Sequence, residues 1–365
     1  DGLESRGLGD VYKRQHVYKS VKNGEHRNTS MDGFNYQKCS VVRWKKEIEA
    51  SNVPMLVLAS WMDAGTAEGT IQRLENFSNS QKVVLMATSH GGWCHASPFT
   101  VSDSLLYPVP TMQVQNQLRL EFFDYHLKGK GTEVEEWPLI RYFNMGEEKF
   151  KESNEWPIPG TVETNFYFQQ DGGLSTAKPT GEQGSDSYKV DFGTATSKEN
   201  RWTTQMGGAV KNLDNRNEMD ERMLVYTSQP ATEDIQITGT PVVRLKMSST
   251  HEDGAVLVYL EDVDENGKST YITEGGLRLI HRHEIEQNGE EFNMHSFSHE
   301  KAEPMVPGEV SEVAFKMWPT SVLIKKGHSI RIAIAGADKS IFDKFPKNGK
   351  PTYEFMRNGT QMSFI

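Results

Sequence analysis

VPMLVLAS (residues 53–60) and KVVLMATS (residues 82–89) are continuous apolar runs of strand length. Such runs are typical of parallel strands covered on both faces, because a strand with one face in water alternates polar and apolar residues. Between them, residues 66–77 place Ala67, Ile71 and Leu74 at helical spacing, with Thr66 as the expected N-cap. This stretch predicts a β-α-β unit.

The two predicted strands end next to residues that suit acid–base chemistry. WMDAG follows the first strand and contains Asp63, and His90-Gly91-Gly92 follows the second. Open parallel sheets place their chemistry at the carboxyl ends of the strands, so Asp63 and His90 are expected at one edge. In a Ser-His-acid triad the histidine takes a proton from the nucleophile and the carboxylate fixes the imidazole tautomer. The structural alternative is an ordinary turn or capping aspartate and a loop histidine.

Composition narrows the class of protein. The chain has 365 residues, 36% of them hydrophobic and 25% charged, which predicts two domains with buried cores. The net charge of -10 is spread over interspersed acidic and basic residues, so nucleic acid is not an expected partner. Cys39 and Cys94 are the only cysteines, and no run approaches the roughly 20 apolar residues of a membrane helix. We expect a soluble protein in an undetermined compartment, with no cofactor, no metal and an unknown oligomeric state.

The second half has an all-β texture. Short alternating runs are separated by Gly, Pro, Asn and Asp, which is typical of a β-sandwich. The predicted strands are TNFYF (164–168), PVVRLKM (241–247), AVLVYLEDV (255–263), EVAFKMW (312–318) and SIRIAIAG (329–336).

Several of these segments resemble one known family. VPMLVLASWMDAGT and VVLMATSHGG resemble the acid and base segments of the cocaine esterase and X-Pro dipeptidyl-peptidase group, and NQLRLEFFDYHLKGKG (116–131) resembles its following helix. LIRYFNMGEEKFKESNEWP (139–157) resembles its crossing into the next domain. EDIQITGTPVVRLKMSS, LEDVDENGKSTYITEGGLRLIHR and PTSVLIKKGHSIRIAIAGAD resemble its jelly-roll domain. The resemblance implies a partial α/β-hydrolase followed by a jelly roll, with Asp63 as triad acid and His90 as general base.

The sequence departs from that family at the nucleophile. A Gly-x-Ser-x-Gly elbow should precede the acid, and none is present. GLESRG (2–7) has the wrong spacing, Ser89 adjoins the base without being expected to face it, and Cys94 follows the histidine in the wrong order. We assign no nucleophile in this chain and expect the fragment itself to be nearly inactive.

The resulting domain prediction has four parts. Residues 1–15 are expected to be a non-native leader, 16–50 the end of a cap with a short helix around 41–50, and 51–135 the carboxy-terminal part of an α/β-hydrolase domain. Residues 136–365 are expected to form the jelly roll, interrupted at its end. A sheet that lacks its earlier strands should expose an unpaired edge.

Two apparent metal motifs have simpler interpretations. Asp262, Asp264 and Asn266 begin like an EF-hand loop, but the twelfth position is Thr273, so a hairpin turn is expected. His281 and His283 could share a strand face, but no third ligand is indicated, and a structural or surface role is expected.

The expected activity of the intact protein is hydrolysis of a small acyl ester or a short peptide through an acyl-enzyme. Release of an X-Pro dipeptide is the alternative within the same family. A non-catalytic jelly-roll protein that binds carbohydrate or peptide is the alternative from another class.

Overall fold

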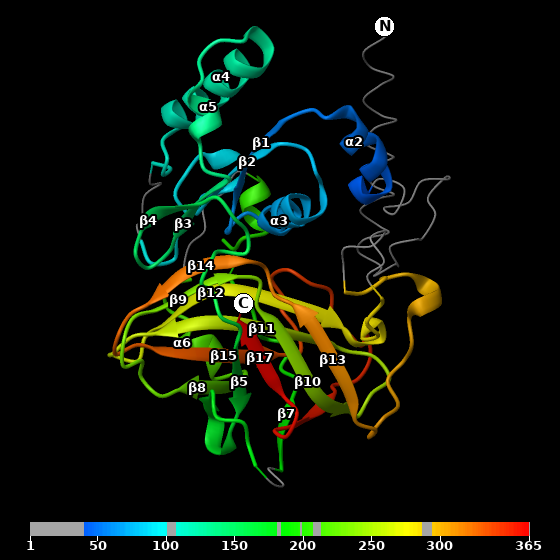
Figure 1. Cartoon of the computed structure of the whole chain (residues 1–365). Helices are drawn as coiled ribbons and strands as arrows, with labels where there is room; N and C mark the ends of the chain where they lie inside the picture. Colours follow the sequence, from blue (N-terminus) through cyan, green and yellow to red (C-terminus); the bar gives the residue numbers. More distant parts are fainter. Residues whose placement is uncertain are drawn as a thin grey trace, which may run out of the picture.

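The computed structural model describes residues 40–100, 107–180, 184–197, 199–206, 213–286 and 294–364. Figure 1 shows a small sheet with its helices stacked above a larger β-sandwich. The leader predicted at residues 1–15 and most of the predicted cap lie outside the described residues.

The first part of the chain is a mixed sheet with helices. Its elements are η2 (Val41–Trp44), α2 (Lys45–Ser51), β1 (Met55–Ser60), α3 (Thr66–Asn76), β2 (Gln81–Met86), η3 (His90–Gly92), α4 (Met112–Lys128), α5 (Glu133–Glu136), β3 (Ile140–Asn144) and β4 (Lys149–Ser153). The strand order is β1-β2-β3-β4. The β1–β2 and β2–β3 pairs are parallel, and β3–β4 is antiparallel. The predicted β-α-β unit is therefore present, as is the short helix expected around residues 41–50.

The start of helix α3 differs from the prediction, and strand β1 has the edge position that was expected. Thr66 is not the N-cap of α3: Gly65 occupies that position, and the Thr66 hydroxyl instead donates to the Asp63 carbonyl oxygen at 2.9 Å. The N-cap prediction was wrong because a β-turn separates the strand from the helix. Strand β1 lies at one end of the sheet order, so it is an edge strand among the described residues.

The second part is a β-sandwich. Its elements are β5 (Thr164–Phe168), η4 (Gln170–Gly172), β6 (Gly173–Ser175), β7 (Ser185–Lys189), η5 (Thr203–Met206), α6 (Asn217–Asp220), β8 (Leu224–Ser228), β9 (Ile235–Gly239), β10 (Val242–Ser249), β11 (Ala255–Val263), β12 (Ser269–Arg278), η6 (Leu279–His281), η7 (His299–Lys301), β13 (Ser311–Lys316), β14 (Thr320–Ile324), β15 (Ser329–Ala335), β16 (Thr352–Met356) and β17 (Gln361–Phe364). Each of the five strands predicted from sequence overlaps one of these.

Pairing in the sandwich runs through one large, curled sheet. Its main path is β12-β11-β15-β8-β6-β5-β17-β10-β16-β7, with β13 beside β10, while β14 and β9 form a separate pair. The curled sheet brings distant strands face to face: the Tyr353 hydroxyl on β16 donates to the Ala255 carbonyl oxygen on β11 at 3.1 Å. The apolar side chains between these layers are buried and form the centre of the core.

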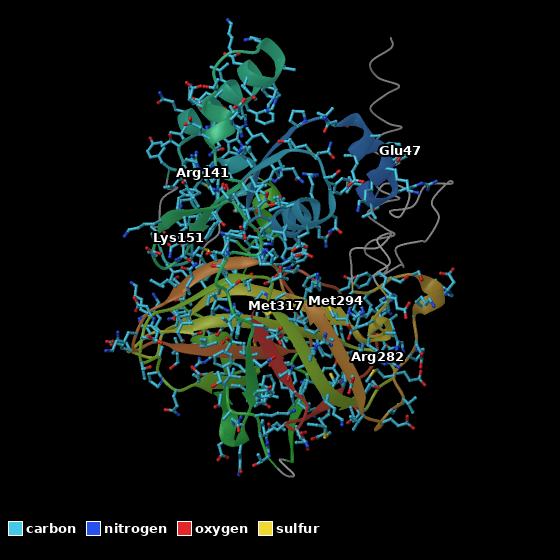
Figure 2. All side chains as sticks on the ribbon, in the orientation of Figure 1. Glu47, Arg141, Lys151, Arg282, Met294 and Met317 are labelled. Carbon is cyan, nitrogen blue, oxygen red and sulfur yellow. The ribbon has the colours of Figure 1, made fainter. Side chains whose placement is uncertain are left out.

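The two parts share that core. Trp61, Leu85 and Phe143 of the upper sheet belong to the same buried cluster as Val322 and Met317 of the sandwich. Figure 2 labels Met317 near the top of the sandwich, while Arg141 and Lys151 mark the β3–β4 hairpin above it. The backbone also crosses the junction, because the Met145 amide donates to the Ser321 carbonyl oxygen at 3.0 Å. The upper sheet therefore rests directly on the β9–β14 side of the sandwich.

The chain passes from the first sheet to the sandwich between β4, which ends at Ser153, and β5, which begins at Thr164. Strand β3 pairs with β2 and strand β4 pairs with β3, so both belong to the first sheet. On α4, Leu118 and Phe122 are buried as a packing face requires, but Val114 is 48% exposed.

Among the described residues, no helix is long and apolar enough to cross a membrane.

Candidate active site

Asp63 and His90 lie together at the carboxyl ends of β1 and β2. His90 Nδ1 is 2.9 Å from Asp63 Oδ2, which is a hydrogen bond from the imidazole N–H to the carboxylate. The Asp63 side chain is only 7% exposed, whereas that of His90 is 53% exposed. The carboxylate is thus enclosed and one side of the imidazole faces outward.

Ser60 joins the loop that carries the acid to the loop that carries the base. Its hydroxyl donates to the Thr88 carbonyl oxygen at 2.7 Å and accepts from the Thr88 amide at 2.8 Å and the Met62 amide at 3.1 Å. Trp61, which is 1% exposed, anchors the same loop through its indole N–H, 2.8 Å from the Phe143 carbonyl oxygen. These bonds fix the two strand ends relative to each other.

The loop of the base depends on two glycines in left-handed conformations. Gly91 has φ of 72° and Gly92 has φ of 73°. A Cβ on Gly92 would lie 2.5 Å from Gln115 Oε1, so no other residue fits there without movement. Gln115, buried on α4, donates from Nε2 to the Gly92 carbonyl oxygen at 3.1 Å and the Pro110 carbonyl oxygen at 2.9 Å. Helix α4 therefore holds the loop of the base.

A partly exposed glutamate, Glu148, orders the chain that follows the base. Glu148 accepts from His95 Nε2 at 3.0 Å, Ser97 Oγ at 2.6 Å and Thr100 Oγ1 at 2.5 Å. Burial alone would raise the pKa of Glu148, but these hydrogen bonds hold the pKa below its usual value. The glutamate is therefore an ionised anchor for residues 95–100.

Arg201 and Thr204, which belong to the sandwich part of the chain, contact Asp63 and the residues beside it. Thr204 Oγ1 lies 3.3 Å from Asp63 Oδ1, and the Arg201 carbonyl oxygen accepts from the Ala64 amide at 3.0 Å. The Arg201 guanidinium donates to the Trp61 carbonyl oxygen. Sequence reasoning missed Arg201 and Thr204, which lie about 140 positions from Asp63 in a stretch without a recognisable motif.

Two of the nucleophile candidates considered from sequence, Ser89 and Cys94, contact each other. Ser89 Oγ is 2.9 Å from Cys94 Sγ, and it accepts from the Cys94 amide at 3.3 Å. Both residues are buried, at 3% and 6% exposure, and they close the turn around His90. GLESRG (2–7) lies outside the described residues.

The two apparent metal motifs have structural roles. Asp264 lies in the turn of the β11–β12 hairpin, where Oδ1 accepts from the Asn266 amide at 2.8 Å and the Lys268 amide at 2.9 Å. His281 is buried in η6, and His283 Nε2 lies 2.8 Å from Glu303 Oε2. Within the described ranges, no cluster of three or more His, Cys, Asp or Glu side chains could hold a metal ion.

Comparisons with known proteins agree on one group. Residues 132–363 match the family model of the X-Pro dipeptidyl-peptidase C-terminal non-catalytic domain. A protein described as a serine esterase from Mycobacterium bovis is 35% identical over 325 residues, covering 88% of this chain and 50% of that protein. Cocaine esterase from Rhodococcus is 25% identical over 324 residues, covering 81% of this chain and 50% of its own length. This chain spans about half the length of these relatives.

A solved structure shares the fold of both parts. An aminopeptidase from a marine sediment Thaumarchaeota archaeon superimposes with a TM-score of 0.73 at 17% identity, covering 99% of this chain and 61% of the other. The fold and these matches define a hydrolase-family protein with a carboxy-terminal β-sandwich. More narrowly, the chain belongs to the family of proteins that carry the X-Pro dipeptidyl-peptidase C-terminal domain.

Proposed function

We propose that Asp63 and His90 are the acid and the general base of a serine hydrolase that cleaves small acyl esters. The observation that carries the proposal is the 2.9 Å hydrogen bond between His90 Nδ1 and Asp63 Oδ2. The chain spans half of its curated relatives, so the activity belongs to the longer protein and this fragment is expected to be nearly inactive. Its upper sheet would then be the carboxy-terminal part of an α/β-hydrolase domain.

The geometry supports a specific division of labour. Because the Asp63 carboxylate accepts a hydrogen bond from the Nδ1–H group, the neutral imidazole of His90 presents Nε2 as a proton acceptor. A serine hydroxyl supplied by the rest of the protein would attack the ester carbonyl carbon and pass its proton to Nε2. The imidazolium, stabilised by the Asp63 carboxylate, would then protonate the departing alkoxide. Water repeats the sequence on the acyl-enzyme and releases the acid.

The half-exposed imidazole suits this role. The His90 side chain is 53% exposed, so its outer side is open to a serine and a substrate carried by other segments. The Asp63 side chain, at 7% exposure, is shielded from competing water, which strengthens its hydrogen bond. The pair is thus preorganised on the acid side and accessible on the base side.

Ester hydrolysis is favoured over release of an X-Pro dipeptide by the relatives. The serine esterase and cocaine esterase matches extend over 88% and 81% of the chain. A protein named as an Xaa-Pro dipeptidyl-peptidase matches only 33% of it. The X-Pro alternative rests on the family name of the sandwich, which describes a non-catalytic domain.

The proposal is tested in the protein encoded by the complete gene. His90→Ala should lower turnover of a p-nitrophenyl ester by roughly 10²- to 10⁴-fold, the usual contribution of a general base. His283→Ala is the matched control, because its side chain is 51% exposed but lies on the sandwich, paired with Glu303. Turnover that survives in His90→Ala would refute the assignment. A complete protein that no fluorophosphonate labels would instead support a non-catalytic binding role.

A further inference from the structure

The loop that carries Asp63 is held on both sides by one buried arginine of the sandwich. Arg201 is 1% exposed and belongs to the segment just before η5. Its guanidinium donates to the Trp61 carbonyl oxygen, two residues before the acid, and its own carbonyl oxygen accepts from the Ala64 amide, one residue after it, at 3.0 Å. The acid therefore lies between two contacts made by a single residue.

The second of these contacts falls on a strained position. Ala64 has φ of 43°, a left-handed conformation that costs a non-glycine residue free energy and persists only where neighbours enforce it. The hydrogen bond from the Ala64 amide to Arg201 is such a restraint. Because the acceptor is the Arg201 backbone carbonyl oxygen, a side-chain substitution removes only the guanidinium bond to the Trp61 carbonyl oxygen, and the turn after Asp63 then depends on the backbone bond alone.

Arg201 is itself anchored in the sandwich. Its guanidinium donates from Nη1 to Thr273 Oγ1 at 3.1 Å and lies 5.7 Å from the centre of the Trp318 ring. The Trp318 ring in turn packs on the acid loop, because a Cβ on Gly65 would lie 3.0 Å from it. The guanidinium thus connects strand β12 to the acid loop, because it bonds both to Thr273 and to the Trp61 carbonyl oxygen.

The segment around Arg201 is also fixed internally. Asn200 Oδ1 accepts from the Trp202 amide at 2.9 Å and the Thr203 amide at 3.2 Å. The Trp202 indole N–H donates to Glu274 Oε1 at 2.7 Å. Thr204 Oγ1 donates to the Arg201 carbonyl oxygen at 2.7 Å, which leaves its 3.3 Å approach to Asp63 as a secondary contact. A segment held at so many points can impose its position on the loop it touches.

We infer that Arg201 is a positioning residue for the catalytic acid: the sandwich clamps the Asp63 loop so that the carboxylate stays on His90 Nδ1. Arg201 lies inside the region matched by the non-catalytic domain model, residues 132–363, so that domain contributes to the geometry of the site. The catalytic part of this inference rests on the proposed function. The structural part concerns the Asp63–His90 hydrogen bond and can be measured without catalysis.

The chain offers a matched control. Arg216 is also 1% exposed and buried in the sandwich, but it contacts Glu261, Ala195 and Thr196 rather than the acid loop. Both arginines should contribute to stability, and only Arg201 should affect the acid.

The first measurement uses this chain and long-range ¹H–¹⁵N spectra at alkaline pH, with His90→Ala to assign the resonances. In the wild type and in Arg216→Met, the neutral His90 ring should carry its proton on Nδ1. In Arg201→Met it should shift toward the Nε2–H tautomer that a free histidine side chain prefers. If Arg201→Met does not fold, Arg201→Lys and Arg216→Lys replace the pair, because lysine keeps the charge but cannot span the same contacts.

The second measurement uses the complete protein. Arg201→Met should lower kcat by roughly 10²-fold with KM nearly unchanged, since small misplacements of a catalytic group have effects of that size. Millimolar guanidinium should partly restore kcat in Arg201→Met and not in Arg216→Met. Equal effects of the two arginines on tautomer and kcat, or no effect of Arg201, would overturn the inference. If His90→Ala keeps full turnover, the proposed function fails, and the tautomer measurement still decides whether Arg201 holds the acid.

Discussion

The acid loop and the base loop meet at one hydrogen bond but are held by different parts of the molecule. Asp63 is buried under contacts from both the upper sheet and the sandwich, through Ser60 on one side and Arg201 on the other. His90 is half-exposed, and its loop is fixed by Gln115 of α4 and by the Ser89–Cys94 turn. The acid loop thus receives hydrogen bonds from the sandwich, while the hydrogen bonds that hold the base loop come from its own part of the chain, and η3 also lies against η5.

The largest expected effect comes from removing the acid's charge without changing its shape. Asp63→Asn in the complete protein should lower kcat by roughly 10³- to 10⁴-fold, because an amide that donates to Nδ1 selects the wrong imidazole tautomer. The measurement is steady-state turnover of a p-nitrophenyl ester. A decrease in kcat of less than tenfold would mean that the Asp63 carboxylate is not important for catalysis.

A change in the base loop should disturb the other side. Gly92→Ala places a Cβ 2.5 Å from Gln115 Oε1 at a φ of 73°, so it should lower the free energy of unfolding by about 2 kcal/mol or more. Gly129→Ala is the matched control, because Gly129 has φ of 63° with open space around it. Urea denaturation of this chain measures both. If both variants lose the same free energy of unfolding, the close approach of Gln115 to Gly92 does not constrain the base loop.

Glu261, which lies away from the acid loop, should make the stability of the sandwich depend on pH. Burial, with repulsion from Asp220, raises the pKa of Glu261 to about 7, so the folded chain holds a proton that the unfolded chain releases near pH 4.5. Stability is therefore greatest below about pH 4.5 for this group and falls as pH rises through about 7, by on the order of 1–3 kcal/mol.

Glu261→Gln should remove that pH dependence, as measured by thermal denaturation between pH 5 and pH 8. The His90 tautomer should not change in this variant, because Glu261 bonds to Arg216 and Ser269 rather than to the acid loop. A tautomer that shifts with Glu261 would indicate that general sandwich stability, and not a local clamp, positions the acid.

The smallest effect is expected at Thr204. Its single hydroxyl proton is directed to the Arg201 carbonyl oxygen at 2.7 Å, and Asp63 Oδ1 is farther away at 3.3 Å. Thr204→Val should therefore lower kcat only about fivefold, as for one neutral hydrogen bond of about 1 kcal/mol. A decrease in kcat as large as that of Asp63→Asn would show that Thr204, and not Arg201, mainly positions the acid.

Sequence reasoning reached part of this arrangement. Asp63 and His90 could be predicted because each follows an uninterrupted apolar strand, and parallel strands bring their carboxyl ends together. The strands of the sandwich could be predicted from alternation and turn residues. Local patterns decide both features.

The remaining features depend on contacts distant in sequence. Arg201 lies in ENRWTT, between two predicted strands, and an arginine there would ordinarily be assigned to the surface. Residues 139–157 were assigned to the domain crossing by resemblance alone, whereas strand β3 within them lies between β2 and β4 of the first sheet. Thr66 could not be distinguished from an N-cap without knowing the turn at Ala64.

The most direct test of the acid–base pair is the protonation site of the neutral His90 ring in this wild-type chain. Long-range ¹H–¹⁵N spectra at alkaline pH distinguish the two tautomers. We expect a proton on Nδ1, held by Asp63, with Nε2 free to accept. A proton on Nε2, as in a free histidine side chain, would contradict this assignment.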